Sequence, residues 1–338
     1  MKSFFDCTRS ELAALFRNAA RANRLYKAVY KKGPLSPGDR AALENFDRSL
    51  PAVIHRFSSA DGTRRFLLQL SDGETIESVL IPEEGRFTFC VSSQIGCALA
   101  CKFCLTGQLG LTRNLSTAEI VSQVVVQLAQ MPARSTDRFS VVFMGMGEPL
   151  QNYENVINAI RILSDHHGLA LPLHRITLST AGLVPGLERL AKEAAFPNLS
   201  ISLTGATDRK RDELMPINQK YPIKDVLEVV RKLPESRRKR VMFEYVMIKG
   251  VTDSLDDARD LATLLHGLRA KVNLIPLNES PDLQFQRAAR ADILRFQEVL
   301  LENHITTFVR KTRGDDVYGA CGQLKRTSSL IDSSSQTL

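Results

Sequence analysis

Residues 90–104 read Cys90-Val-Ser-Ser-Gln-Ile-Gly-Cys97-Ala-Leu-Ala-Cys101-Lys-Phe-Cys104, and they hold four of the six cysteines of the chain. Gly96 before the last three cysteines, and Gly107 and Gly110 after them, predict a loop in which thiolates can converge on one metal centre. A structural zinc site normally takes four ligands from two separated pairs. Three thiolates can instead hold three irons of a four-iron, four-sulfur cluster and leave the fourth iron open to a small molecule.

A regular alternation of apolar runs and amphipathic segments follows this stretch. The apolar runs predict six strands, at residues 87–91, 140–144, 175–179, 199–203, 241–246 and 272–275. The segments between them predict helices, one of which begins at Ser116 as N-cap with Glu119 in the capping-box position. Such an alternation indicates an α/β fold with a parallel sheet or partial barrel. A further helix over residues 288–303 and a strand over 306–309 precede a loop that carries Cys321.

The N-terminal part has a different character. Residues up to about Leu50 predict helices, and short apolar runs over residues 53–82, separated by Asp-Gly pairs, predict a small hairpin sheet. We therefore expect an accessory α+β domain over residues 1–84 with possible RNA contact, and a main domain over residues 85–325. The serine-rich end, residues 326–338, predicts a disordered tail.

Composition limits the function classes. A chain of 338 residues with 43% hydrophobic and 24% charged residues is typical of a soluble globular protein. The net charge of +8 favours a polyanionic partner, such as a nucleic acid. Neither a membrane-length apolar segment nor a signal peptide is recognisable, which predicts a cytoplasmic protein without membrane contact. In that reducing compartment, clustered thiols indicate metal binding or catalysis rather than a disulfide framework.

Unusual residues follow several predicted strands, where barrel enzymes place their sites. Gly145-Met-Gly-Glu-Pro follows the second strand, Ser179-Thr-Ala-Gly the third, Ser202-Leu-Thr-Gly the fourth and Asn278 the sixth. The glycines open the backbone to a ligand, and Glu148 offers an anionic acceptor for an ammonium group. Taken alone, such a loop is most often an ordinary turn between strand and helix. Likewise, Cys90 or Cys321 could complete a structural zinc site.

Together these motifs resemble a known family. The cysteine spacing, with Phe103 before the last cysteine, is the signature of radical S-adenosylmethionine (SAM) enzymes. The wider match, from Glu77 to Leu324, resembles the RlmN/Cfr RNA adenosine methyltransferases. It includes Ile176-Thr-Leu-Ser-Thr-Ala-Gly, Val272-Asn-Leu-Ile-Pro, Val309-Arg-Lys-Thr-Arg-Gly-Asp-Asp and Ala320-Cys321-Gly-Gln-Leu. The closing motif with Cys321 is specific, because radical SAM enzymes in general do not carry it.

The resemblance implies a partial (β/α)6 radical SAM barrel with a small N-terminal α+β accessory domain. It also implies one [4Fe-4S] cluster and two SAM molecules per turnover. By analogy, the cluster ligands are Cys97, Cys101 and Cys104, and the SAM-binding residues are Gly147, Glu148, Ser179, Ser202, Leu203, Thr204 and Asn278. Thr204 stands where the family usually has His.

The family's mechanism assigns roles to three more residues. Cys321 takes a methyl group from one SAM, and a radical made from a second SAM removes hydrogen from that methyl so that it adds to the adenine ring. Cys90 then attacks the sulfur of Cys321, which releases the base and leaves a transient disulfide. Glu77 matches the family's proton acceptor. On residues alone, Cys321 would be an inert thiol and Glu77 an ordinary strand residue.

The expected substrate is carbon 2 of a 23S rRNA adenosine, with tRNA as a second target. One alternative is a Cfr-type carbon 8 methyltransferase or a paralogue that acts on another RNA. A rival from a different class is a zinc-stabilised RNA-binding protein without catalysis. The enzyme reading also implies an electron donor such as flavodoxin, and we expect a monomer.

Overall fold

The computed structural model describes residues 1–131, 138–268 and 270–324. The tail predicted over residues 326–338 lies outside these ranges. Among the helices of the described part, none has both the length and the apolar composition that crossing a membrane requires.

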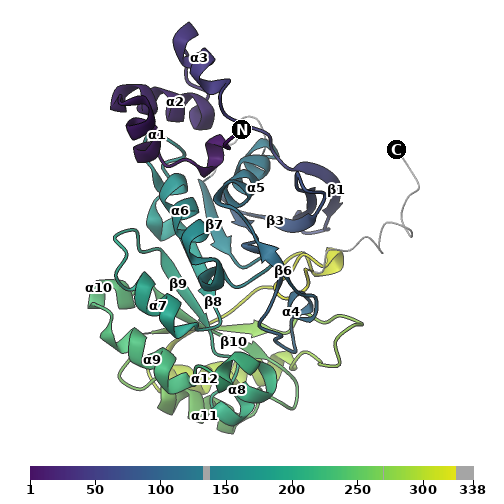
Figure 1. Ribbon diagram of the computed structural model, residues 1–338. Helices are drawn as coiled ribbons and strands as arrows, with labels where there is room; N and C mark the ends of the chain where they lie inside the picture. Colours follow the sequence, from purple (N-terminus) through teal and green to yellow (C-terminus); the bar gives the residue numbers. More distant parts are fainter. Residues whose placement is uncertain (132–137, 269, 325–338) are drawn as a thin grey trace, which may run out of the picture.

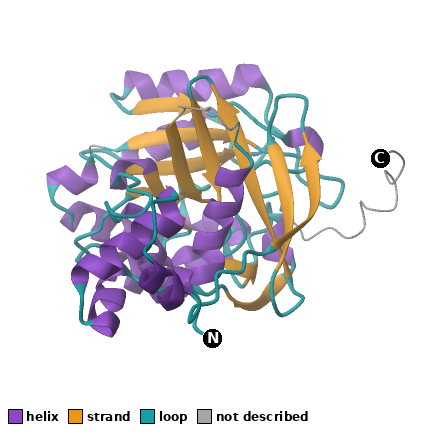
Figure 2. Cartoon of the chain, turned by 90° about the horizontal axis from the view of Figure 1, so that it is seen from above, coloured by secondary structure: helices purple, strands orange, loops and turns teal. Residues whose placement is uncertain are grey.

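One sheet of ten strands forms the centre of the molecule (Figure 2). Its order is β1-β2-β3-β4-β7-β8-β9-β10-β11-β12, with antiparallel pairing up to β4 and parallel pairing from β4 onward. The antiparallel strands are β1 (Ala52–Ser58), β2 (Arg64–Gln69), β3 (Thr75–Glu83) and β4 (Arg86–Cys90). The others are β7 (Arg138–Phe143), β8 (Ile176–Thr180), β9 (Asn198–Ser202), β10 (Val241–Met247), β11 (Lys271–Pro276) and β12 (Thr306–Val309).

The predicted fold class is confirmed. The six expected strands are β4, β7, β8, β9, β10 and β11, and β12 adds a seventh parallel strand. The order of the sheet ends at β1 and β12, so the described strands form an open, partial barrel.

Helices between the strands pack on the outer side of the parallel sheet (Figure 1). The α-helices after β4 whose buried side chains belong to the main apolar core are α5 (Thr117–Ala129), α6 (Tyr153–Ser164), α7 (Val184–Leu190), α9 (Ile223–Lys232), α11 (Leu255–Leu264) and α12 (Arg290–Glu302). The other described helices after β4 are α4 (Leu105–Gln108), α8 (Asp208–Leu214), α10 (Glu235–Arg238), η2 (Pro149–Asn152), η3 (Leu173–Arg175), η4 (Pro216–Gln219) and η5 (Asp315–Val317). The capping box predicted at Ser116 and Glu119 begins α5.

Alternation along the strands separates the core from the barrel interior. In β9, Leu199 and Ile201 belong to the apolar core beneath the helices, while Ser200 and Ser202 point to the opposite face. In β10, Phe243 belongs to the same core. The neighbouring Glu244 faces the interior, where Ser200 Oγ donates to its Oε1 at 2.6 Å. Polar side chains inside the barrel are therefore a direct result of the two-residue period.

The N-terminal helices have a small core of their own. They are η1 (Phe4–Asp6), α1 (Arg9–Phe16), α2 (Ala19–Lys31) and α3 (Pro37–Leu43). Phe4, Leu12, Leu25 and Tyr26 are buried together, and Cys7 is a buried member of the same group. An ion pair between Arg9 and Asp165 at 2.9 Å ties this group to α6.

The hairpin strands differ from the expectation of a separate small sheet. β3 pairs with β4 across a tight turn at residues 84–85, so the barrel sheet continues through the predicted domain boundary. Val79 of β3 lies opposite Cys90 of β4 in this pairing. The sequence pattern correctly predicts the hairpin strands. It does not show that β3 pairs with the backbone edge of β4.

Candidate active site

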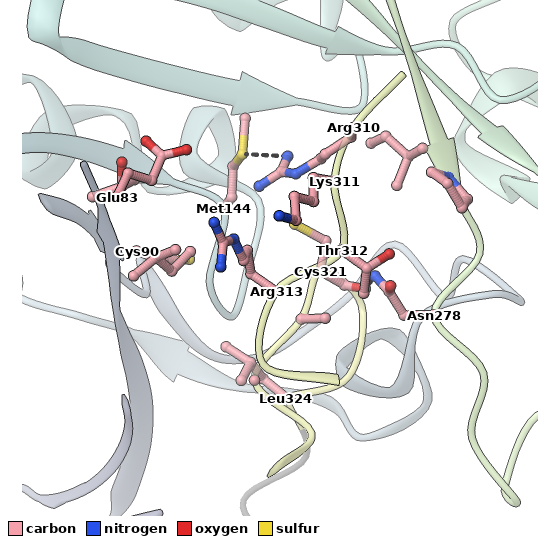
Figure 3. Close-up of a pocket in the computed structure, with 16 residues that line it drawn as sticks. Glu83, Cys90, Met144, Asn278, Arg310, Lys311, Thr312, Arg313, Cys321 and Leu324 are labelled. Carbon is pink, nitrogen blue, oxygen red and sulfur yellow. Dashed lines mark hydrogen bonds between the residues drawn. The ribbon is translucent and has the colours of Figure 1, made fainter. Parts of the chain in front are cut away.

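Two cavities meet inside the barrel, at the carboxyl ends of its strands. The first, which we call the cysteine-loop cavity, has a volume of about 900 Å³ when the part open to solvent is counted, and it is lined by the loop that carries Cys97, Cys101 and Cys104. The second, the Cys90 cavity, has a volume of about 910 Å³ counted in the same way, and it lies between β3, β4 and the loop after β12 (Figure 3). Cys321 and Asn278 line both cavities.

The cysteine loop begins in a two-stranded hairpin of β5 (Gln94–Cys97) and β6 (Gly110–Asn114). Gly96 is required there, because it has a φ of +77° and a Cβ would lie 1.9 Å from the Gly110 carbonyl oxygen. Burial raises the pKa of the Cys97 thiol to about 12 and that of Cys101 well above its ordinary value. Thiols in such surroundings ionise when a metal compensates the charge.

The three cysteines of the loop share one cavity. Within residues 1–131, 138–268 and 270–324, no group of three or more His, Cys, Asp or Glu side chains is placed to hold a single metal ion. Cys97, Cys101 and Cys104 nevertheless line one cavity. Three thiolates are the number of protein ligands that a four-iron cluster with one open iron takes.

Glu148 is a buried carboxylate in the wall of the cysteine-loop cavity. Its Oε1 accepts from the Leu150 amide at 2.9 Å, and its Oε2 accepts from the Ala181 amide at 2.8 Å. Burial raises the pKa of Glu148 to about 6, while these amide donors act in the opposite direction. Gly147 lies against the cysteine hairpin, because a Cβ there would lie 2.5 Å from Gln94 Cβ.

Asn278 carries an open acceptor. Its Nδ2 donates to the Cys321 carbonyl oxygen at 2.9 Å, and its buried Oδ1 has no hydrogen-bond partner among the described residues. Buried polar atoms are normally satisfied, so an unpartnered oxygen in a cavity wall indicates a ligand with a donor group. Ser179 and Ser202 line the same cavity.

The structure does not bring every expected ligand residue to this cavity. Leu203 is fully buried in the apolar core on the opposite face of the sheet from Ser202. Thr204 is also fully buried, adopts a φ of 54°, and is not among the cavity-lining residues. For Leu203 the physical reason is the two-residue period of the strand, which turns the side chain after Ser202 away from the interior.

Sequence reasoning missed Glu244. This buried acid lines the cysteine-loop cavity, accepts from Ser200 and lies 3.9 Å from Arg310 Nη1. A signal was present in the sequence, because an acid inside the apolar run Val241-Met-Phe-Glu-Tyr-Val-Met indicates a polar interior position.

The Cys90 cavity is basic and contains two thiols. Cys90 and Cys321 both line it, and the structure records them as free thiols. Arg310, Lys311 and Arg313 contribute cationic side chains from the loop after β12 (Figure 3). The loop after β12 therefore brings Cys321 and three cationic side chains to the cavity of Cys90.

Glu77 is placed differently from Cys90. Its side chain is fully buried and forms an ion pair with the equally buried Arg65, whose guanidinium lies 4.0 Å from the centre of the Phe57 ring. Glu77 lines neither of the two cavities. The proton-acceptor role of Glu77 stays a prediction.

Comparison with known proteins identifies the family. The family model described as "Radical SAM superfamily" matches residues 91–262. A dual-specificity RNA methyltransferase RlmN from Geobacter sulfurreducens is 46% identical, over 90% of this chain and 86% of that protein. Another, from Pelobacter propionicus, is 49% identical over 90% and 89%. The chain belongs to the RlmN family of radical SAM RNA methyltransferases. It is a SAM-dependent enzyme, as expected.

A solved structure agrees with membership of the RlmN family. The crystal structure of a radical SAM methyltransferase from Sphaerobacter thermophilus is 38% identical, covers 97% of this chain and all of that one, and superposes with a TM-score of 0.90. RlmN membership implies SAM and a [4Fe-4S] cluster as cofactors, and an RNA as substrate. It excludes the reading of the chain as a zinc-stabilised binding protein without catalysis.

Proposed function

We propose that the enzyme methylates carbon 2 of an adenosine in 23S rRNA, with tRNA as a second substrate, through a methylated cysteine. The observation that carries this proposal is the position of Cys321, which lines the cysteine-loop cavity and the Cys90 cavity at once. A sulfur at this junction can receive a methyl group on one side and deliver it to a base on the other. The relatives' name, dual-specificity RNA methyltransferase, supports two RNA substrates.

The cofactors have suitable residues around the cysteine-loop cavity. Cys97, Cys101 and Cys104 would hold the [4Fe-4S] cluster, which when bound supplies the electron that splits SAM into methionine and a deoxyadenosyl radical. Glu148 would accept from the SAM ammonium group, and Asn278 Oδ1 would accept from a second donor of SAM. Ser179, Ser202 and the backbone of Gly147 complete this surface. One cluster per chain and two SAM molecules per turnover remain part of the proposal.

The chain's own sulfurs perform the transfer. Cys321 first becomes methylated, and its methyl carbon then becomes bonded to the adenine ring, so that enzyme and RNA are covalently joined. Cys90 attacks the sulfur of Cys321 and frees the base. Lys311 and Arg313, in the same cavity, would hold the phosphates on either side of the adenosine. Glu77 is the predicted proton acceptor in these reaction steps. The predicted electron donor is a flavodoxin-like protein, and the enzyme is predicted to be monomeric and cytoplasmic.

Mass spectrometry of RNA tests the proposal directly. Nucleosides from 23S rRNA and tRNA of a deletion strain should lack 2-methyladenosine, and the intact gene should restore it. A strain that instead loses 8-methyladenosine would favour the Cfr-type alternative. Loss of neither nucleoside would overturn the proposed substrate.

A further inference from the structure

The surroundings of Cys90 make it a poor nucleophile. Its side chain is buried, which raises the pKa of the thiol to about 12, and the neighbouring Cys321 adds to the rise. A thiol reacts as its thiolate, and at neutral pH this environment suppresses the thiolate. The step that frees the methylated base therefore needs a group that favours ionisation of Cys90.

Few charged groups face Cys90. From β3, Glu83 lines the same cavity, but its carboxylate is paired with Arg86. From the loop after β12 come Arg310, Lys311 and Arg313, of which Arg313 lies 3.8 Å from Asp61. β7 contributes the uncharged Met144, and Gln127 of α5 donates to the Cys90 carbonyl at 3.4 Å. Glu77, farther along β3, is already paired with Arg65.

Arg310 is the cation that the structure holds in place. Its Nη1 donates to Met144 Sδ at 3.6 Å and lies 3.9 Å from the buried Glu244 Oε2 (Figure 3 shows the contact with Met144). Its backbone amide donates to the Leu274 carbonyl at 2.8 Å, which fixes the start of the loop. The Cys321 thiol and Glu244 raise the pKa of Arg310, so its positive charge persists.

Met144 connects this cation to Cys90. The Met144 backbone amide hydrogen-bonds the Cys90 sulfur, and the Met144 side chain accepts from Arg310. The amide and the guanidinium both lower the pKa of Cys90 against the effect of burial. Glu244 and Met144 thus hold a positive charge in the cavity that contains the sulfur that must ionise.

We propose that Arg310 activates Cys90 for its attack on the sulfur of Cys321. The inference rests on the proposed function, since it assigns a residue to the base-releasing step. In that step an S–S bond forms between Cys90 and Cys321 while the bond between the Cys321 sulfur and the methylene carbon breaks. The electron pair of the broken bond stays on the carbon, which takes up a proton. The two sulfurs are oxidised and the carbon is reduced.

Release of the covalent protein–RNA adduct tests this role. Arg310→Met should still accept a methyl group on Cys321, measured by peptide mass, but should accumulate the adduct at pH 7. A single nearby charge shifts a pKa by about one unit or more, so release should slow about tenfold and its pH profile should move up by about one unit. Arg310→Lys should restore part of the rate. Arg313→Met, which removes a cation from the same cavity, should raise KM for RNA without accumulating adduct.

A second measurement does not depend on turnover. Labelling of Cys90 by iodoacetamide, followed by peptide mass across pH in cofactor-free protein, should need higher pH in Arg310→Met than in Arg313→Met. Equal labelling profiles together with wild-type release by Arg310→Met would overturn the inference. Adduct accumulation in Arg313→Met but not in Arg310→Met would also overturn it. The same holds if a change in KM for RNA is the sole effect of Arg310→Met. If Cys90→Ala itself traps no adduct, the proposed function fails, and that outcome is separate from a failure of Arg310 alone.

Discussion

The two cavities are built in opposite ways. The cysteine-loop cavity takes its three candidate cluster ligands from eight consecutive positions, residues 97–104, which a hairpin and the short helix α4 hold together. The Cys90 cavity takes its two thiols from positions more than 200 residues apart, on β4 and on the loop after β12. Local sequence is therefore sufficient to bring the three candidate cluster ligands together, whereas the two thiols of the second cavity meet only when the whole sheet has formed.

The largest expected effect comes from the cysteine loop. Cys101→Ala removes one of three cluster ligands, so iron should fall from about four atoms per chain to near zero, and RNA methylation should be lost. Iron analysis of anaerobically purified protein measures this. Cys7→Ala is the matched control, because that buried thiol lies in the core of the N-terminal helices. Full iron content in Cys101→Ala would show that Cys101 is not a cluster ligand.

Cys90→Ala should impair the chemistry of the Cys90 cavity and leave the cysteine-loop cavity intact. The cluster should remain, because Cys90 lines only the second cavity, but turnover should stop at a covalent adduct between Cys321 and RNA. Denaturing gels of protein with labelled RNA report the adduct. The double variant with Cys321→Ala should show none, and an adduct that persists there would contradict the assigned roles.

Protonation of Glu148 should affect the cysteine-loop cavity alone. If its carboxylate binds the SAM ammonium group, SAM affinity should be constant above pH 7 and fall as pH drops through about 6, where the carboxylate takes up a proton. Glu148→Gln should weaken SAM binding about tenfold, the size of one charged hydrogen bond, and should flatten this pH dependence. Calorimetric titration between pH 5 and 8 measures both. An unchanged pH profile in Glu148→Gln would exclude Glu148 from SAM binding.

The smallest effect on methylation is expected from substitutions at Ser202, the last residue of β9, and at Leu203, which follows it and faces the opposite side of the sheet. Ser202→Ala should weaken SAM binding a few-fold with little loss of stability, because Ser202 lines the cavity. Leu203→Ala should cost about 2–5 kcal/mol of folding free energy, because it leaves a void in the core, and should bind SAM normally while folded. Chemical denaturation and SAM titration distinguish the two. The reverse pattern would restore Leu203 as a cofactor contact.

Much of the fold was predictable because its signals are local. Apolar runs at regular intervals predicted the parallel strands, and Ser116 with Glu119 predicted the start of α5. The partners of the N-terminal hairpin were not predictable, because pairing of β3 with β4 depends on an edge that local pattern does not describe. Glu244 was overlooked for a different reason, since a single acid in an apolar run shows its role only when Ser200 of the next strand lies beside it.

By itself, the sequence determined the cysteine loop, the glycines that allow it and the alternation of strands and helices. These features depend on residues that are near neighbours in the chain, where spacing and backbone conformation suffice. The tertiary structure alone decided that Cys321 lies at the junction of two cavities, that Glu77 is paired with Arg65, and that Arg310 lies in the cavity of Cys90. These contacts join segments far apart in the chain, and only the packed barrel brings them within reach of each other.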